Sequence, residues 1–205
     1  MTAICDKLIL TDCDGVLLDW EFGFTDWMRR KGYHLSENEF ENYLGKYAIN
    51  ERYGELTKSG AKTLVREFNN SAEMLSLSPL HSSIKYIKKL NEEHGYVFHM
   101  ISSQTDNKAA QKLRIMNLEN VFGKHVFTEH TILGCGDDKD GALEPYRDTG
   151  CYWLEDKPAN AQVGHEIGLR SILVSHHYNK VHDFIGSSIP RLNWKEIYEL
   201  ITSDY

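Results

Sequence analysis

The sequence contains few cysteines, and none of them stands at the spacing of a structural zinc site. No Cys-x-x-Cys pair occurs, and the four cysteines are scattered along the chain: Cys5, Cys13, Cys135 and Cys151. A chain of 205 residues can bury enough apolar surface to fold without a disulfide framework. We therefore expect free thiols and a cytoplasmic protein.

Long apolar runs and an excess of positive charge are also missing. No apolar run approaches the roughly 20 residues that a membrane helix needs. The formal net charge of -7 disfavours binding to a nucleic-acid polymer or to an anionic membrane surface. The opening "MTAICDKLIL" lacks the pattern of a signal peptide, so we expect it to lead into the first strand.

What the sequence does contain is an alternation of short apolar segments with helix-like segments. The apolar strand candidates are residues 7–10, 96–101, 125–133, 151–156 and 171–175. The helix candidates between and after them are residues 79–95, a helix through 109–116, 160–167 and 193–201. This alternation predicts an α/β fold, a Rossmann-like parallel sheet with helices on both faces.

Residues 19–78 interrupt this alternation soon after the first strand. Aromatic and charged residues recur there at helical spacing, glycines separate the groups, and no strong strand pattern appears. The sequence thus predicts a core domain of residues 1–18 and 79–205 with a small helical cap of residues 19–78. The cap aromatics could form its own apolar core or stack on a nucleotide base.

Acidic and hydroxyl side chains follow three of the predicted strands. Asp12 and Asp14 follow the first, Ser102 the second, and Glu155 with Asp156 ends a later one. Asp-x-Asp-Gly alone also suits an ordinary turn. However, the carboxyl ends of parallel strands share one sheet edge, and carboxylates gathered there repel one another unless a cation joins them. Hard oxygen ligands of this kind suit Mg²⁺.

Three stretches resemble motifs of the haloacid dehalogenase-like (HAD) superfamily. "LILTDCDGVLL" resembles the first motif, "VFHMISS" the second, and "CYWLEDKPANAQVGHEIGLRSILV" the fourth. The resemblance covers most of the chain outside residues 19–78. It implies the HAD fold, and it places the predicted cap where many members carry a helical C1 cap.

The resemblance also implies roles for the residues of the first two motifs. Asp12 would attack phosphorus and form an aspartyl-phosphate, and Asp14 would act first as general acid and then as general base. Ser102 would bind a phosphate oxygen, with Ser103 as the alternative hydroxyl. Gly15, in the turn after the two aspartates, would lie at the phosphate-binding loop.

A bound Mg²⁺ is the cofactor that the resemblance implies. The Asp12 carboxylate, the Asp14 backbone carbonyl and Asp156 would hold it, with Glu155 contributing through water.

The third-motif lysine is assigned to Lys139, in "GDDKDGALE". Its ammonium group would neutralise Asp12 and the phosphate. Lys124 and Lys157 are the alternatives for this role.

An aspartate at position 14 separates branches of the superfamily. A halide leaving group needs no proton, whereas an alkoxide does, so Asp14 favours phosphate esters over dehalogenation. The expected activity is a Mg²⁺-dependent phosphatase acting on a small phosphorylated substrate. A phosphomutase or phosphotransferase, and a catalytically silent binding protein, are the alternatives. "DCDGVLLDWEFGF" is similar to the opening of 5'(3')-deoxyribonucleotidases, which favours nucleoside monophosphates.

Three histidines beside the last strand lack a ligand spacing with any carboxylate. We expect them to be surface or loop residues. They are His176, His177 and His182. The oligomeric state is left open by the sequence.

Overall fold

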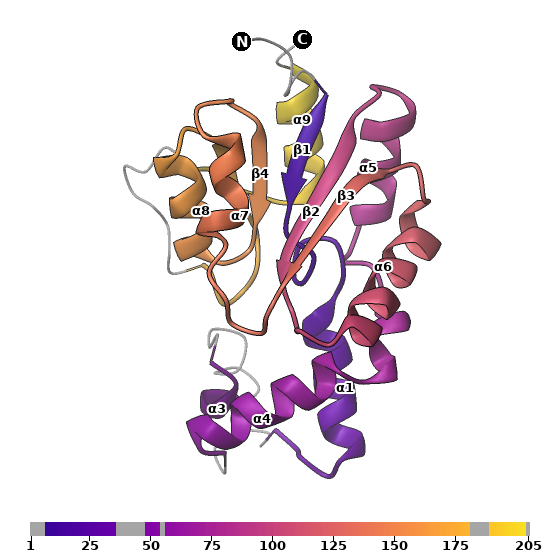
Figure 1. The fold of residues 1–205 in the computed structure, drawn as a ribbon, viewed down its shortest axis with the longest axis vertical. Helices are drawn as coiled ribbons and strands as arrows, with labels where there is room; N and C mark the ends of the chain where they lie inside the picture. Colours follow the sequence, from indigo (N-terminus) through magenta and orange to yellow (C-terminus); the bar gives the residue numbers. More distant parts are fainter. Residues whose placement is uncertain (1–6, 36–47, 54–55, 181–188, 204–205) are drawn as a thin grey trace.

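The computed structural model describes residues 7–35, 48–53, 56–180 and 189–203 (Figure 1). Its six strands form one sheet in the order β3-β2-β1-β4-β5-β6, and every neighbouring pair is parallel. The strands are β1 (Leu8–Thr11), β2 (Val97–Ser103), β3 (Phe127–Leu133), β4 (Tyr152–Glu155), β5 (Arg170–Val174) and β6 (Arg191–Leu192). The predicted α/β parallel sheet is confirmed.

Both faces of the sheet are buried. Neighbouring residues along its strands belong to different apolar clusters, one on each face. Ile9 and Leu10 are both fully buried, yet they belong to two separate apolar clusters. The larger cluster includes residues of α5 (Ser83–Glu92), α6 (Lys108–Phe122) and α9 (Trp194–Ser203). The smaller one includes residues at α7 (Asp140–Leu143) and α8 (Pro158–Glu166). This double burial explains why the strands read as apolar runs instead of alternating patterns.

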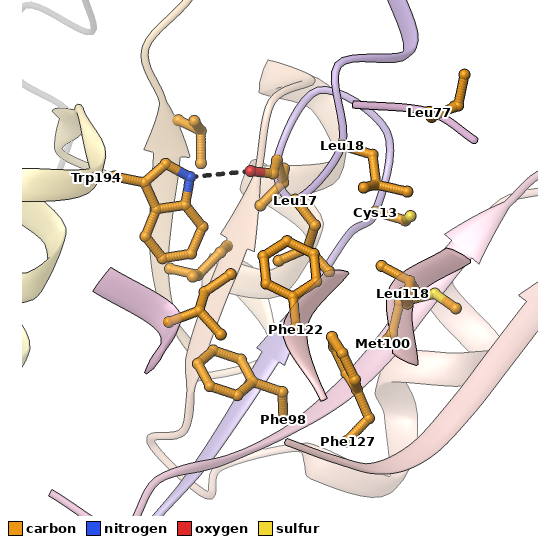
Figure 2. Packing of buried hydrophobic residues seen from close by; sticks show 14 of the residues in the cluster. Cys13, Leu17, Leu18, Leu77, Phe98, Met100, Leu118, Phe122, Phe127 and Trp194 are labelled. Carbon is orange, nitrogen blue, oxygen red and sulfur yellow. Dashed lines mark hydrogen bonds between the residues drawn. The ribbon is translucent and has the colours of Figure 1, made fainter. Parts of the chain in front are cut away.

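The larger core also anchors the turn that follows β1. Figure 2 shows Trp194 at the start of α9, where its indole Nε1 donates a hydrogen bond to the Val16 carbonyl at 2.9 Å. Cys13, Leu17 and Leu18 of the same turn are fully buried in this core. The turn is therefore held by packing and by a buried hydrogen bond from the last helix.

Between β1 and β2 the chain leaves the sheet and forms a helical insert. Its elements are α1 (Trp20–Arg30), α3 (Ile49–Arg52), α4 (Lys58–Asn69) and η2 (Ala72–Leu75). Figure 1 shows α1, α3 and α4 beyond the carboxyl ends of the strands. The insert begins and ends at adjacent backbone: the Asp19 N–H bonds the Ser78 carbonyl, and the Leu80 N–H bonds the Leu17 carbonyl, each at 2.8 Å.

Most described aromatic residues of the insert pack against one another. The rings of Trp20 and Phe24 stack with centroids 4.7 Å apart, and Phe68 of α4 contacts both edge-on. These contacts support the interpretation that the aromatics form an apolar core of the insert. Phe22 is the exception, with 65% of its surface exposed. Tyr43 and Tyr47 lie outside the described residues.

One helix start and one strand differ from the sequence predictions, and one cap is confirmed. The helix expected from Pro79 begins at Ser83, because Pro79 is held in a bridge with Leu18. The two-residue strand β6 was not predicted. Asn193 caps α9 as expected: its Oδ1 accepts the backbone N–H groups of Lys195 and Glu196 at 2.9 and 3.2 Å.

The expectation of free thiols is wrong for Cys151, which is disulfide-bonded. Cys13 and Cys135 are free. Cys151 directly precedes β4, which pairs with β1, so the fold brings it close to chain far away in the sequence. Spacing along the sequence does not show such neighbours, because a disulfide requires proximity in space alone.

Within the described residues, no helix is long and apolar enough to cross a membrane.

Candidate active site

A tight turn at the end of β1 presents Asp12 at the carboxyl edge of the sheet. The Asp12 N–H continues the ladder to the Leu154 carbonyl at 2.9 Å, and the Cys13 carbonyl then accepts the N–H groups of Leu17 and Leu18. Gly15 lies in this turn at φ +75°, where a side chain is strained. A Cβ at Gly15 would also lie 2.7 Å from Asp156 Oδ2. The turn therefore needs glycine for its backbone and for the close approach of Asp156.

Asp12 is a buried carboxylate with a strong cationic partner. Its Oδ2 lies 2.7 Å from the Lys139 ammonium, and its Oδ1 accepts the Cys13 N–H at 2.6 Å. Burial raises the pKa of Asp12 to about 6, although Lys139 and a hydrogen bond from Ser102 lower it. The nearby Glu155 carboxylate raises this pKa further.

Lys139 is the lysine that the fold brings to Asp12. It precedes α7 in the loop after β3, is 3% exposed, and bridges Asp12 Oδ2 and Glu155 Oε2 at 2.7 Å each. Burial alone would lower the pKa of Lys139, but the two carboxylates outweigh it and raise that pKa. The side chain of Lys124 is 84% exposed and pairs with Glu119. Lys157 contacts the site through its backbone N–H, which Glu155 accepts.

Glu155 and Asp156, at the end of β4, have different environments. The Glu155 Oε1 accepts the backbone N–H groups of Asp156 and Lys157, and its Oε2 accepts Lys139 and Asn160. Glu155 is thus saturated by protein donors. Asp156 has a pKa of about 6, raised by burial and by the nearby Asp12 carboxylate.

These carboxylates form a cluster suited to a divalent cation. Oxygen atoms of Asp12, Glu155 and Asp156 lie within 4.8 Å of one another, and all three residues are buried. Lys139 is the ammonium that bridges two of them, so the ionised cluster has an excess of two negative charges. Hard oxygen donors with this charge fit a hard divalent cation.

Asp14 is held by an arginine that the sequence analysis did not single out. Arg114 of α6 places its Nη1 2.5 Å from Asp14 Oδ1. Burial raises the pKa of Asp14 to about 6, while Arg114 lowers it. No sequence signal marks Arg114, because it follows no motif and lies inside a helix.

The two serines at the end of β2 point to different partners. Ser102 is 3% exposed, and its hydroxyl lies close enough to the Asp12 carboxylate to lower the pKa of Asp12. Ser103 donates instead to the Asp137 carbonyl at 2.7 Å. Only Ser102 is therefore brought to Asp12.

The loop after β5 adds two residues that sequence reasoning did not assign to the site. The Tyr178 hydroxyl donates to Asp156 Oδ2, and the Tyr178 ring stacks on His176 with centroids 4.7 Å apart. His176 Nε2 contacts the Gly15 carbonyl at 2.5 Å, and burial lowers the pKa of this histidine. His176 is thus a loop histidine, as expected, but it supports the Gly15 turn. His182 lies outside the described residues.

Several contacts join the insert to the core beside this site, and two of them involve α3 and the end of α4. Arg52 of α3 lies over the Tyr178 ring, 5.9 Å from its centroid, and forms an ion pair with Glu21 of α1 at 2.9 Å. At the end of α4, Asn69 and Gln104 exchange hydrogen bonds, each side-chain amide donating to the other's backbone carbonyl at 3.1 Å. Gln104 is two residues beyond Ser102, so this clasp joins the insert to the strand end that carries Ser102.

No protein-family model and no curated protein matches the chain. Solved structures do match over almost the whole chain. A haloacid dehalogenase-like family hydrolase from Streptococcus pneumoniae is 15% identical, with a TM-score of 0.63 and coverage of 95% of this chain and 97% of that one. The chain has the HAD fold.

Two further structures show the same likeness. A predicted phosphatase from Clostridium acetobutylicum is 15% identical, with a TM-score of 0.64 and coverage of 97% of this chain and 99% of that one. CbbY from Rhodobacter sphaeroides, in complex with xylulose-(1,5)bisphosphate, is 16% identical, with a TM-score of 0.57 and coverage of 93% and 95%. L-2-haloacid dehalogenases also share the HAD fold, so the fold by itself does not choose the reaction.

Within the HAD fold, the residues assigned to the four motifs come from four different strand ends. Asp12 follows β1, Ser102 ends β2, Lys139 follows β3, and Glu155 with Asp156 lies at the end of β4. All of them lie at the carboxyl edge of the sheet, where open α/β sheets bind their ligands. The structure brings these residues together at that edge, as expected from their positions after parallel strands.

Proposed function

We propose that this protein is a Mg²⁺-dependent phosphatase that hydrolyses a small phosphate monoester through Asp12. The observation that carries the proposal is the buried pair of Asp12 and Lys139, 2.7 Å apart, with the second carboxylate Asp14 two residues further along. A carboxylate held by an ammonium suits nucleophilic attack on an anionic substrate. A second carboxylate beside it supplies the acid and base that a phosphate ester requires and a halide does not.

The proposed reaction has two steps. In the first, an Asp12 oxygen attacks phosphorus, the bond from phosphorus to the ester oxygen breaks, and Asp14 gives its proton to that oxygen. In the second, Asp14 takes a proton from water, whose oxygen attacks phosphorus and releases Asp12 and inorganic phosphate. Lys139 and Ser102 neutralise and bind phosphate oxygens in both steps.

The cation would be held by Asp12, Asp156 and the Asp14 backbone carbonyl, while Glu155, whose oxygens accept four protein donors, would contribute its charge instead of a water-mediated contact. When bound, Mg²⁺ offsets the repulsion between these carboxylates and the phosphate. The support for this assignment is the charge excess of the cluster and its oxygen donors. Glu155, saturated by protein donors, would keep Lys139 and the backbone of Asp156 in place.

Residues 19–78 would act as a cap that encloses the substrate and selects its leaving group. Nucleoside monophosphates are the favoured substrates, on the resemblance of the first motif to deoxyribonucleotidases. Phosphorylated sugars are the second candidate, because CbbY, with the same fold, was solved with a sugar bisphosphate.

Phosphate release from a panel of nucleoside and sugar monophosphates tests the proposal. Turnover should require Mg²⁺, stop with EDTA, and fall by at least about 10³-fold in Asp12→Asn, which lacks the nucleophile. Asp138→Asn makes the same change at an exposed residue beside Lys139 and should keep wild-type turnover. Folded wild-type protein that releases phosphate from no ester would contradict hydrolysis.

Product analysis separates the phosphatase from the phosphotransfer alternative. Hydrolysis releases one inorganic phosphate for each ester consumed, whereas a phosphomutase or phosphotransferase returns the phosphoryl group to an organic acceptor. Substrate loss without matching inorganic phosphate would favour transfer. A protein that binds the esters without consuming them would be the silent binding protein.

A further inference from the structure

We propose that Arg114 is a positioning residue that holds the Asp14 carboxylate in place for proton transfer to the leaving group. This role rests on the proposed phosphatase activity. Arg114 itself touches neither the nucleophile nor the other carboxylates of the cluster among its described contacts, so it would act through Asp14 alone.

The contact between the two side chains has two points. Arg114 Nη1 lies 2.5 Å from Asp14 Oδ1 as an ion-pair contact, and the hydrogen bond runs from Nη2 to Oδ2 at 3.4 Å. A planar guanidinium that meets both oxygens fixes the plane of a carboxylate as well as its position. A lysine at this place would fix the charge but leave the carboxylate free to rotate.

The remaining surroundings of the guanidinium give it little other support. Among the described residues, its other hydrogen-bond partners are sulfur atoms, Cys13 Sγ at 3.5 Å and Met74 Sδ at 3.0 Å, and its Nε has no partner there. Arg114 is only 1% exposed. Burying a charge so sparsely bonded costs stability, and an apolar residue would fill this helix position more favourably. The ion pair with Asp14 is the described contact that accounts for a buried arginine at this position.

A neighbouring residue on the same helix has a purely structural contact and provides the matched control. Asn117 follows Arg114 by three residues and therefore lies on the same face of α6. Its amide donates to the carbonyls of Leu75 and Leu77 at 2.8 and 3.2 Å, where the chain returns from the insert. Asn117→Ala thus disturbs the packing around α6 without removing the partner of Asp14.

The test compares two leaving groups through kcat/KM, which reports the steps up to formation of the aspartyl-phosphate. p-Nitrophenyl phosphate releases a phenolate that needs no proton. The alkyl probe is whichever nucleoside 5'-monophosphate or hexose 6-phosphate the wild-type protein hydrolyses fastest, and its alkoxide does need one. Arg114→Met should lower kcat/KM for the alkyl ester by about 10- to 100-fold, part of a general-acid effect, and for p-nitrophenyl phosphate by less than about threefold.

A double variant tests whether Arg114 acts through Asp14. In an Asp14→Asn background, adding Arg114→Met should cause no further loss with the alkyl ester, because the group that it positions is already missing. Asn117→Ala should keep the wild-type ratio of the two kcat/KM values. If Arg114→Met does not fold, Arg114→Lys keeps the charge and should lower the same ratio severalfold.

Any other result overturns either the positioning role of Arg114 or the proposed function. Equal losses with both esters, or a further loss in the Asp14→Asn background, would make Arg114 a structural residue and overturn its positioning role. A wild-type ratio in Arg114→Met or in the folded lysine variant would do the same. A wild-type protein that hydrolyses neither ester would overturn the proposed function itself, and the positioning role with it.

Discussion

Lys139 is the side chain on which the charge balance of the site depends. It is the bridge between Asp12 and Glu155, and no exposed lysine of the described chain could replace it at 2.7 Å from both. We expect Lys139→Met to lower kcat by about 10²- to 10³-fold, as the loss of a buried charge-stabilising donor does in other enzymes. Steady-state kinetics would measure this, with the exposed Lys124→Met as control. Equal effects of the two substitutions would refute the assignment.

His99 of β2 should make stability fall at acidic pH. Burial lowers its pKa, and its ring nitrogens contact the Tyr146 hydroxyl and Thr131 Oγ1. The unfolded chain therefore takes up a proton below about pH 6.5 that the folded chain resists, so the stability present above this pH is lost as the pH falls.

The difference in unfolding free energy between wild type and His99→Gln isolates this residue from other titrating groups. Urea denaturation at pH 7.5 and 5.5 should show a smaller wild-type advantage at the lower pH. An advantage that does not change with pH would show that His99 titrates alike in both states.

Side chains at strand ends were predictable, and those inside helices were not. Asp12 and Ser102 lie where apolar strand segments end, and the topology of a parallel sheet places such groups together. Arg114 had no such marker, since the buried face of α6 mixes the polar Gln111 and Asn117 with the apolar Leu118 and Phe122. Tyr178 was equally unmarked, because its place depends on how a loop folds back over the Gly15 turn.

At the level of elements, α8 packs closely against the sheet through Gly164. A Cβ at Gly164 would lie 2.4 Å from Trp153 Cδ1 of β4 and 2.8 Å from Ser171 Oγ of β5. We expect Gly164→Ala to lower the unfolding free energy by about 1–3 kcal/mol through overpacking, although alanine is the better helix former. Chemical denaturation would measure it.

The matched control is Gly141→Ala in α7, where an added Cβ would meet nothing within 4 Å. This change should be neutral or stabilise by up to about 1 kcal/mol. Similar destabilisation by both alanines would mean that helix packing is not the cause.

Elements with their own periodic pattern were predicted, whereas those that depend on partners were not. The strands β1 to β5 and the capped helix α9 follow from apolar runs and from Asn193. The strand β6 has only two residues and exists through its pairing with β5. Pro79 suits a helix start by local preference, but tertiary pairing with Leu18 holds it outside the helix.

For the whole molecule, the clasp between Asn69 and Gln104 should limit the opening of the insert. Gln104→Ala removes the side-chain amide that bonds the Asn69 carbonyl, a buried contact of about 1 kcal/mol. We expect backbone N–H exchange in α4 to rise by about fivefold, while α6 is unchanged. Hydrogen-exchange mass spectrometry would measure both.

Gln162→Ala provides the control, since its amide bonds only Glu166 within α8 among its described contacts. It should leave exchange in α4 at the wild-type rate. An unchanged rate in Gln104→Ala as well would mean that other contacts hold the insert.

The two ends of the insert run side by side at Leu18 and Pro79, which pair as antiparallel neighbours. Chain ends that leave and re-enter at one point can be joined by a tight turn, or can carry a different polypeptide, without moving the strands beneath them. The junction at Leu18 and Pro79 is therefore an insertion point on the sheet that carries Asp12. A protein engineer could exchange the whole insert at that junction, and natural recombination could do so by the same route, while Asp12 and Lys139 stay where they are.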